Sequence, residues 1–230
     1  MPVAFATVAE GKCDHPVLEN IIIGLCKKHG IEVGNINPTQ PEIDKTGRQL
    51  GFGGWGQVFR WLREKRYDEA FQYNDFVIIH LDTDACEEVD FDIQKYSDGV
   101  EKNPLELVNA VIEKLKGLIG NEDLAIYQGR FHFAISVHNI ECWLLPLWGK
   151  KTEYCLIHSC KLRVDKGLSR EKQPGLNKED IRTYDNASSK LRKHSSLFDT
   201  AKSQDSLQHF LDSISNACQE VKPQPSDDKS

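Results

Sequence analysis

Three apolar runs along the chain predict buried β-strands. Residues 3–9 (VAFATVA), 75–81 (DFVIIHL) and 131–137 (FHFAISV) are almost continuously apolar and contain β-branched or aromatic side chains. Such runs are typical of parallel strands that are covered on both faces. A shorter strand is predicted over 31–36, and the Gly-, Pro-, Thr- and Gln-rich stretch 37–56 predicts a long loop.

Helices are predicted between and after these strands. Apolar positions recur at spacings of three and four in 16–29, 57–70, 104–117, 139–148 and 205–219. Asp14 precedes the first of these helices and is interpreted as its cap. The order of elements predicts an α/β fold, a mainly parallel sheet with helices on both faces.

The amino-acid composition and the pattern of apolar residues change near residue 150. The stretch 150–193 is basic, polar and poor in strand patterns, and the last residues are KPQPSDDKS. We therefore predict an α/β domain over 1–150, a mostly helical polar C-terminal segment over 151–220, and a disordered tail over 221–230.

Composition narrows the classes of function. No apolar run approaches the roughly 20 residues that span a bilayer, and the first residues lack the basic region of a signal peptide. Seven cysteines without a CxxC pair predict reduced thiols, so we expect a cytoplasmic protein with no membrane association. A net charge of -6 argues against binding nucleic acid through bulk positive charge, so any phosphate contact must come from local Lys and Arg side chains.

Acidic residues follow two of the predicted strands. Glu10 comes directly after the first strand, and Asp82 and Asp84 follow the strand 75–81. Ligands of open parallel sheets bind beyond the carboxyl ends of the strands, and residues i and i+2 of an extended chain face the same way. Carboxylate oxygens suit Mg²⁺ or Mn²⁺, so this pattern predicts a metal site. The alternative is that these acids only cap turns and helices.

The same motifs resemble a known family. A strand-ending Glu-Gly, a helix, and then a strand ending in Asp-x-Asp is similar to the Toprim fold of topoisomerases, bacterial primases and OLD-type (overcoming lysogenisation defect) nucleases. The stretch VAEGKCDHPVLENIIIGL resembles the opening of small bacterial Toprim-like proteins of phage-defence operons, and FAISVHNIECWLLPLW resembles their second signature. The resemblance covers residues 3–148. Lys12-Cys13 stand where the family has a small Thr or Ser.

The resemblance implies a metal-dependent nuclease that acts in bacterial antiviral defence. Glu10 would be the catalytic acid or base and a metal ligand, Asp82 and Asp84 would hold Mg²⁺, and Glu141 would be a supporting acid. Family members often work beside an ATPase, and this chain has no ATPase motif of its own, so the resemblance also implies an ATPase partner protein.

Basic residues are the candidates for substrate contacts. Lys12 follows Glu10 and is a candidate to contact a scissile phosphate. Lys45 and Arg48 are candidates for a basic rim, with solvated surface charge as the alternative. Arg130 is a candidate either for substrate binding or for pairing with Glu141. GFGGWG (51–56) lacks the GxxxxGK[ST] pattern, so it predicts a mobile loop instead of a nucleotide-binding loop.

The leading hypothesis is a Mg²⁺-dependent nuclease that cleaves DNA or RNA. Two alternatives stay open at this point. One is a Mg²⁺-dependent phosphatase or phosphotransferase, because a strand-ending Asp-x-Asp also serves that chemistry. The other is a non-catalytic subunit that binds an ATPase partner. The sequence does not give the oligomeric state, and homodimers are the commonest assembly.

Overall fold

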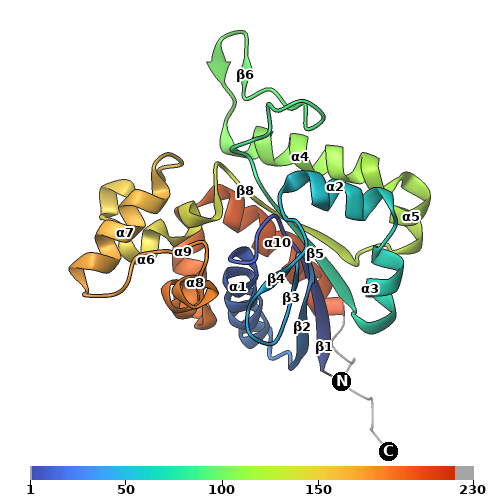
Figure 1. Ribbon diagram of the computed structural model, residues 1–230, viewed down its shortest axis with the longest axis horizontal. Helices are drawn as coiled ribbons and strands as arrows, with labels where there is room; N and C mark the ends of the chain where they lie inside the picture. The colour runs from blue at the N-terminus through green and yellow to red at the C-terminus, as the bar shows by residue number, and fades with distance from the viewer. Residues whose placement is uncertain (1, 221–230) are drawn as a thin grey trace, which may run out of the picture.

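Four neighbouring parallel strands make up most of a six-stranded sheet of order β4-β3-β2-β1-β5-β8 (Figure 1). In spatial order the four are β2 (Val33–Gln40), β1 (Val3–Val8), β5 (Phe76–Asp82) and β8 (Phe131–Ser136). The short strands β3 (Glu42–Ile43) and β4 (Gln49–Leu50) extend the sheet beyond β2 in antiparallel orientation. This computed structural model describes residues 2–220, with side chains up to residue 215. The predicted α/β fold with a mainly parallel sheet is confirmed.

Helices cover both faces of the sheet (Figure 1). The helices that share a core with one face are α1 (Asp14–His29), α7 (Cys160–Arg170), α8 (Ile181–Ser188), α9 (His194–Ala201) and α10 (Asp205–Glu220). The helices on the other face are α2 (Trp55–Arg63), α3 (Tyr67–Tyr73) and α4 (Pro104–Ile119). Shorter elements are the hairpin β6 (Tyr96–Ser97) and β7 (Val100–Glu101), α5 (Asn121–Ile126), α6 (Leu145–Trp148), and the 3₁₀ turns η1 (Ile140–Leu144), η2 (Lys151–Glu153) and η3 (Ser189–Arg192).

The strands β1, β5 and β8 each contribute side chains to both hydrophobic cores. In β5, Ile78 packs with α1 and the C-terminal helices, whereas Val77 and Ile79 pack with α2 and α4. In β1, Phe5 and Ala6 divide in the same way. Successive side chains of a strand point to opposite faces, so burial on both faces requires the continuous apolar runs seen in the sequence.

Several predicted boundaries differ from the structure. The stretch 37–56 is not a single loop, because β2 continues to Gln40 and the hairpin of β3 and β4 follows. The predicted helix 57–70 is two helices, α2 and α3, which are separated where Lys65 takes a positive φ of 53°. The stretch 139–148 begins as the 3₁₀ turn η1 and becomes α-helical only at α6. The helix predicted over 205–219 is confirmed as α10.

Side chains beyond residue 150 share a core with the N-terminal half. Tyr184, Leu197 and Phe210 belong to the same buried cluster as Val17 and Ile21 of α1. α1 approaches η3 so closely that a Cβ on Gly24 would lie 2.0 Å from the Leu191 carbonyl oxygen, which requires glycine there. The boundary at residue 150 stays a prediction, and the predicted tail 221–230 lies outside the described residues.

Two further observations concern the predicted location of the chain. Cys142 and Cys160 form a disulfide, so the expectation of reduced thiols is wrong for this pair. Among the described residues, none of the helices combines the length and apolar character needed to cross a membrane.

Candidate functional site

The carboxyl ends of β1 and β5 border a cavity of about 550 Å³. These strands are parallel neighbours, so their last residues meet at one edge of the sheet. The cavity lining includes Glu10 just after β1, Asp82 at the end of β5, Asp84, and Glu141 from η1. The structure therefore brings together the four acids that the sequence predicted as site residues.

Glu10 is held by its neighbours on both sides. Its Oε1 accepts a hydrogen bond of 2.9 Å from the backbone N–H of Asp82, and its carbonyl oxygen accepts one of 2.7 Å from the N–H of Gly54. A Cβ on Gly53 would lie 2.4 Å from that carbonyl oxygen, so only glycine allows this approach. The GFGGWG segment, predicted to be a mobile loop, thus packs its backbone against the candidate catalytic residue.

Burial raises the pKa of Glu10 to about 8. The hydrogen bond from Asp82 opposes this shift, the charges of Asp14 and Asp84 add to it, and the positive charge of Lys178 opposes it. A carboxyl group with a pKa near neutrality is suited to proton transfer.

Asp14 also belongs to this cavity, although the sequence analysis interpreted it as a helix cap. Its Oδ2 accepts a hydrogen bond of 2.9 Å from the N–H of Gly11, and its side chain lines the same space as Glu10. Burial raises the pKa of Asp14 to about 7, with the charge of Glu141 acting in the same direction. The sequence signal was available: an acid lies four residues after Glu10, across a tight turn.

Asp82 is half-buried beside the polar side chains of Ser136 and His80. The hydroxyl of Ser136 in β8 donates to Asp82 Oδ1. Burial raises the pKa of Asp82 well above its ordinary value, and the charges of Asp14 and Glu10 raise it further. This carboxyl group therefore resists ionisation when no cation is near it.

His80 lies in the core directly behind these acids. Its Nε2 is 3.5 Å from Asp82 Oδ1 and its Nδ1 is 3.7 Å from Asp14 Oδ2, yet neither nitrogen makes a hydrogen bond within the described structure. Burial lowers the pKa of His80 to about 3, so the ring is neutral. The sequence analysis gave His80 no role, and the structure places it against two site carboxylates.

Glu141 has a different partner from the one the sequence suggested. The phenol of Tyr184 in α8 donates to Glu141 Oε1 at 2.7 Å, and Glu141 is 3 % exposed.

Arg130 lies at the opposite end of the sheet, just before β8 begins. It donates to the carbonyl oxygens of Asp75 and Asn74 and lies 4.4 Å from the centre of the Phe71 ring. The structure therefore does not bring Arg130 to the acidic cavity or to Glu141.

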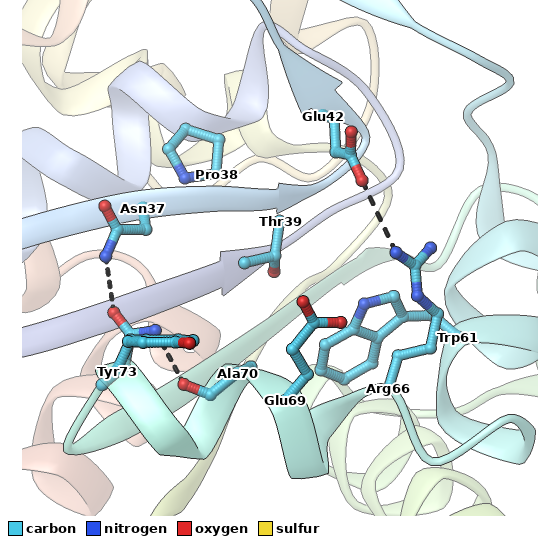
Figure 2. Close-up of a pocket in the computed structure, with 10 residues that line it drawn as sticks. Asn37, Pro38, Thr39, Glu42, Trp61, Arg66, Glu69, Ala70 and Tyr73 are labelled. Atoms are coloured by element: carbon cyan, nitrogen blue, oxygen red, sulfur yellow. Dashed lines mark hydrogen bonds and ion pairs between the residues drawn. The ribbon is translucent and has the colours of Figure 1, made fainter.

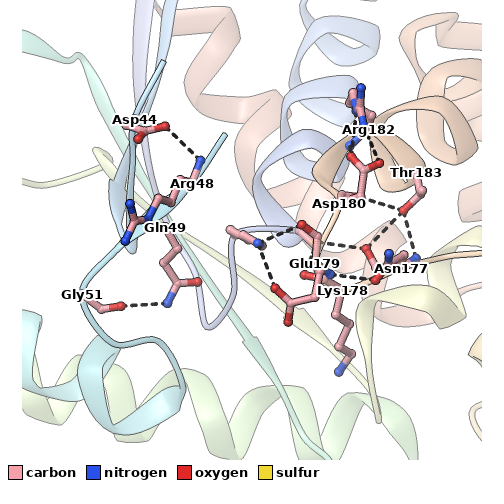
Figure 3. A network of polar contacts seen from close by, with 12 residues as sticks. Asp44, Arg48, Gln49, Gly51, Asn177, Lys178, Glu179, Asp180, Arg182 and Thr183 are labelled. Atoms are coloured by element: carbon pink, nitrogen blue, oxygen red, sulfur yellow. Dashed lines mark hydrogen bonds and ion pairs between the residues drawn. The ribbon is translucent and has the colours of Figure 1, made fainter. Parts of the chain in front are cut away.

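Basic side chains reach the cavity from two segments that face each other. Figure 3 shows the β3–β4 hairpin, with Arg48, opposite the loop that carries Lys178 and Glu179. Arg48 and Lys178 both line the acidic cavity. Lys178 was missed because the polar stretch around it has no periodicity that would relate it to Glu10.

The other two predicted basic residues have different surroundings. Lys12 lines the cavity, but its Nζ donates to the carbonyl oxygen of Glu179 at 3.0 Å and lies 3.3 Å from Glu179 Oε2. Lys45 lines an adjacent hollow with Arg182 instead of the acidic cavity. Lys12 thus connects the turn after β1 to the C-terminal segment.

The donor atoms of the cavity suit a hard divalent cation. They are carboxylate oxygens, which Mg²⁺ and Mn²⁺ prefer, and among the described residues the lining has one thiol, Cys13, and no pair of thiolates that would favour zinc. Within the described residues, no group of three or more His, Cys, Asp or Glu side chains is already arranged to hold a metal ion. Oxygens of Glu10, Asp82 and Glu141 instead accept hydrogen bonds from protein donors.

A separate cavity of about 350 Å³ lies between β2 and helices α2 and α3 (Figure 2). Its lining includes Trp61, Tyr73 and an ion pair in which Arg66 lies 3.5 Å from Glu42. None of the predicted site residues lines this cavity, so the acidic cavity is the candidate functional site.

The fold and this site define an α/β protein with a carboxylate-lined cavity at the carboxyl edge of a parallel sheet. Comparison of the chain with family models, with curated proteins and with solved structures finds no significant match.

The raised pKa values of the site acids predict that stability falls between pH 6.5 and 8 in metal-free buffer. In this range the fold still binds protons at Glu10 and Asp14 that the unfolded chain has released, so ionisation of these groups opposes folding. The buried histidines His15, His80 and His132 act in the opposite direction, because their pKa values are lowered in the fold while the unfolded chain still binds protons on them near pH 6.5. Each of them therefore offsets the loss by about 0.4 kcal/mol between pH 6.5 and 8. The expected net loss from these groups is on the order of 1 kcal/mol.

Chemical denaturation at both pH values measures this loss directly. Asp82→Asn is expected to reduce the pH dependence, and Asp90→Asn, on the exposed loop after β5, is expected to leave it unchanged. A free energy of unfolding that is constant or rises from pH 6.5 to 8 contradicts the prediction.

Proposed function

We propose that this chain is a metal-dependent nuclease that hydrolyses phosphodiester bonds of DNA or RNA with Mg²⁺ or Mn²⁺. The observation that supports this most is the convergence of Glu10, Asp14, Asp82, Asp84 and Glu141 on one cavity. Carboxylates crowded in a buried space are unfavourable when ionised unless a cation neutralises them. Burial raises the pKa values of Glu10, Asp14 and Asp82 in this cluster, and clustered groups with raised pKa values mark a functional site.

The residues divide into three roles in this proposal. Glu10, Asp82 and Asp84 hold the cation, with Glu141 as a further ligand or support. When bound, the ion polarises a phosphoryl oxygen and lowers the pKa of an attacking water. Glu10, at the carboxyl end of β1 beside Asp82, is also the group proposed to accept or return a proton during hydrolysis.

Arg48 and Lys178 are proposed to contact the phosphate groups of the substrate. They line the cavity from opposite sides, and charge-assisted hydrogen bonds to phosphate are strong. Lys12 is proposed to contact the scissile phosphate only after its ammonium group has left Glu179. In the structure that group contacts the Glu179 carbonyl oxygen and carboxylate. Lys45 is proposed to contact the substrate only outside the acidic cavity.

The biological setting in this proposal rests on the sequence resemblance alone. It makes the chain an effector of a bacterial antiviral system that works beside an ATPase partner protein. The proposed cytoplasmic location comes instead from the sequence composition, and a homodimer is proposed only because homodimers are the commonest assembly.

Incubation with plasmid, single-stranded DNA and total RNA tests the proposal. Each substrate is incubated with Mg²⁺, with Mn²⁺ or with EDTA, and a parallel series contains nucleotides and p-nitrophenyl phosphate. The proposal predicts polymer cleavage that requires the metal. Hydrolysis of the small phosphoesters alone would favour the phosphatase alternative. Absence of cleavage, both alone and with lysate of the native host, would contradict nuclease activity.

A further inference from the structure

Phe52 is a large apolar side chain that the fold presents to solvent. It is 84 % exposed, and Leu50 beside it is 49 % exposed. The backbone around Phe52 is nevertheless held in place. Its carbonyl oxygen accepts a hydrogen bond of 3.1 Å from Gln40 Nε2, and Gly54, two residues later, donates to the Glu10 carbonyl oxygen at 2.7 Å. The ring is therefore displayed from a fixed point of the structure.

That fixed point lies at the rim of the acidic cavity. Arg48 and Gln49 before it, and Gly54 after it, all line the cavity. Two Cα steps separate Phe52 from Gly54, so their Cα atoms lie within roughly 8 Å of each other. The backbone of Phe52 thus belongs to the segment that borders the cavity next to Glu10.

Charge alone gives this protein little attraction for nucleic acid. The net charge is -6, and the cavity itself is lined with acids. Affinity from counterion release requires several phosphate contacts by basic side chains, and here Arg48 and Lys178 are the basic residues that line the cavity together with Lys12, which is engaged by Glu179. An uncharged source of affinity is needed, and an exposed aromatic ring next to basic side chains provides one.

We propose that Phe52 is a stacking platform for an unpaired base of the strand whose phosphate enters the acidic cavity, so that the substrate is single-stranded nucleic acid. Stacking of bases on aromatic side chains beside a basic groove is the usual way in which single strands are bound. The bases of an intact duplex are stacked on each other and must be unstacked first. This inference rests on the proposed nuclease function and adds the class of substrate to it.

Binding of a fluorescently labelled oligonucleotide, with Ca²⁺ in place of Mg²⁺, tests the stacking. Phe52→Ala is expected to weaken single-strand binding about tenfold, and Phe52→Trp is expected to retain it. The matched control is Tyr73→Ala, because Tyr73 is an aromatic side chain that is 74 % exposed but lines the separate cavity. Wild-type protein is expected to bind the single strand more tightly than the duplex of the same sequence.

Cleavage of the same oligonucleotides with Mg²⁺ separates this inference from the function on which it rests. If wild-type protein cleaves and Phe52→Ala binds and cleaves single strands equally well, the stacking proposal is overturned while the nuclease stands. A wild-type preference for duplex overturns it as well. If wild-type protein cleaves no polymer with Mg²⁺ or Mn²⁺, either alone or with lysate of the native host, the nuclease proposal itself fails.

Discussion

Glu10→Gln is expected to lower the rate of metal-dependent cleavage by about a thousandfold, within the range that general acid–base catalysis contributes. The substitution removes both a metal-binding charge and the group that exchanges a proton. The fold should persist, because the amide oxygen of glutamine can still accept the hydrogen bond that Asp82 donates to Glu10. At pH 8 the variant should be at least as stable as the wild type, since it lacks a carboxyl group whose ionisation is unfavourable in the fold.

Single-turnover cleavage rates and thermal melts measure the two effects on the same samples. Glu122→Gln is a suitable control, because Glu122 is an exposed acid in α5 that does not line the cavity. Cleavage that stays within a factor of ten of the wild-type rate in Glu10→Gln would remove Glu10 from the catalytic role. A variant that loses both activity and its cooperative melt would leave Asp82→Asn as the informative substitution.

Removal of residues 151–230 is expected to prevent the remaining 150 residues from folding. Val17, Ile21 and Leu25 of α1 are fully buried, and they belong to one cluster with side chains of α8, α9 and α10. Without those helices this apolar surface faces water, at a cost of about 25 cal/mol for each Å². The truncated chain also loses Lys178 and Tyr184 from the site.

Circular dichroism and thermal melting of the truncated chain check this expectation. A chain that ends at residue 220 is the control, since it keeps all helices of the described structure, and it should melt cooperatively. A cooperative melt of residues 1–150 alone would establish residue 150 as a true domain boundary and would contradict the view that both halves form one core.

The parts of the fold that could be predicted are those with a repeated pattern in the sequence. β5 was predicted correctly because burial on both faces requires an unbroken apolar run. The hairpin of β3 and β4 was missed because strands of two residues carry no periodicity, and β2 carries polar residues and Pro38. The break between α2 and α3 was missed because the apolar spacing continues across it.

The candidate site was predicted where position along a strand determines position in space. Glu10, Asp82 and Asp84 follow parallel strands, and the rule that ligands bind at their carboxyl ends placed them together. Arg130 precedes β8, and the same rule assigns it to the opposite end of the sheet. Tyr184 could not be predicted, because its contact with Glu141 joins residues 43 positions apart through packing of α8 on the sheet.

The central claim is that the acids after β5 form the metal-dependent centre of a nuclease. Its most direct test compares cleavage by wild-type protein, by the pair Asp82→Asn with Asp84→Asn, and by the pair Asp90→Asn with Asp92→Asn. The control pair has the same spacing but lies on the loop outside the cavity, at positive φ values that asparagine tolerates. Metal-dependent cleavage that is lost only in the first pair is the predicted result. Equal cleavage by both pairs and the wild type would contradict the claim.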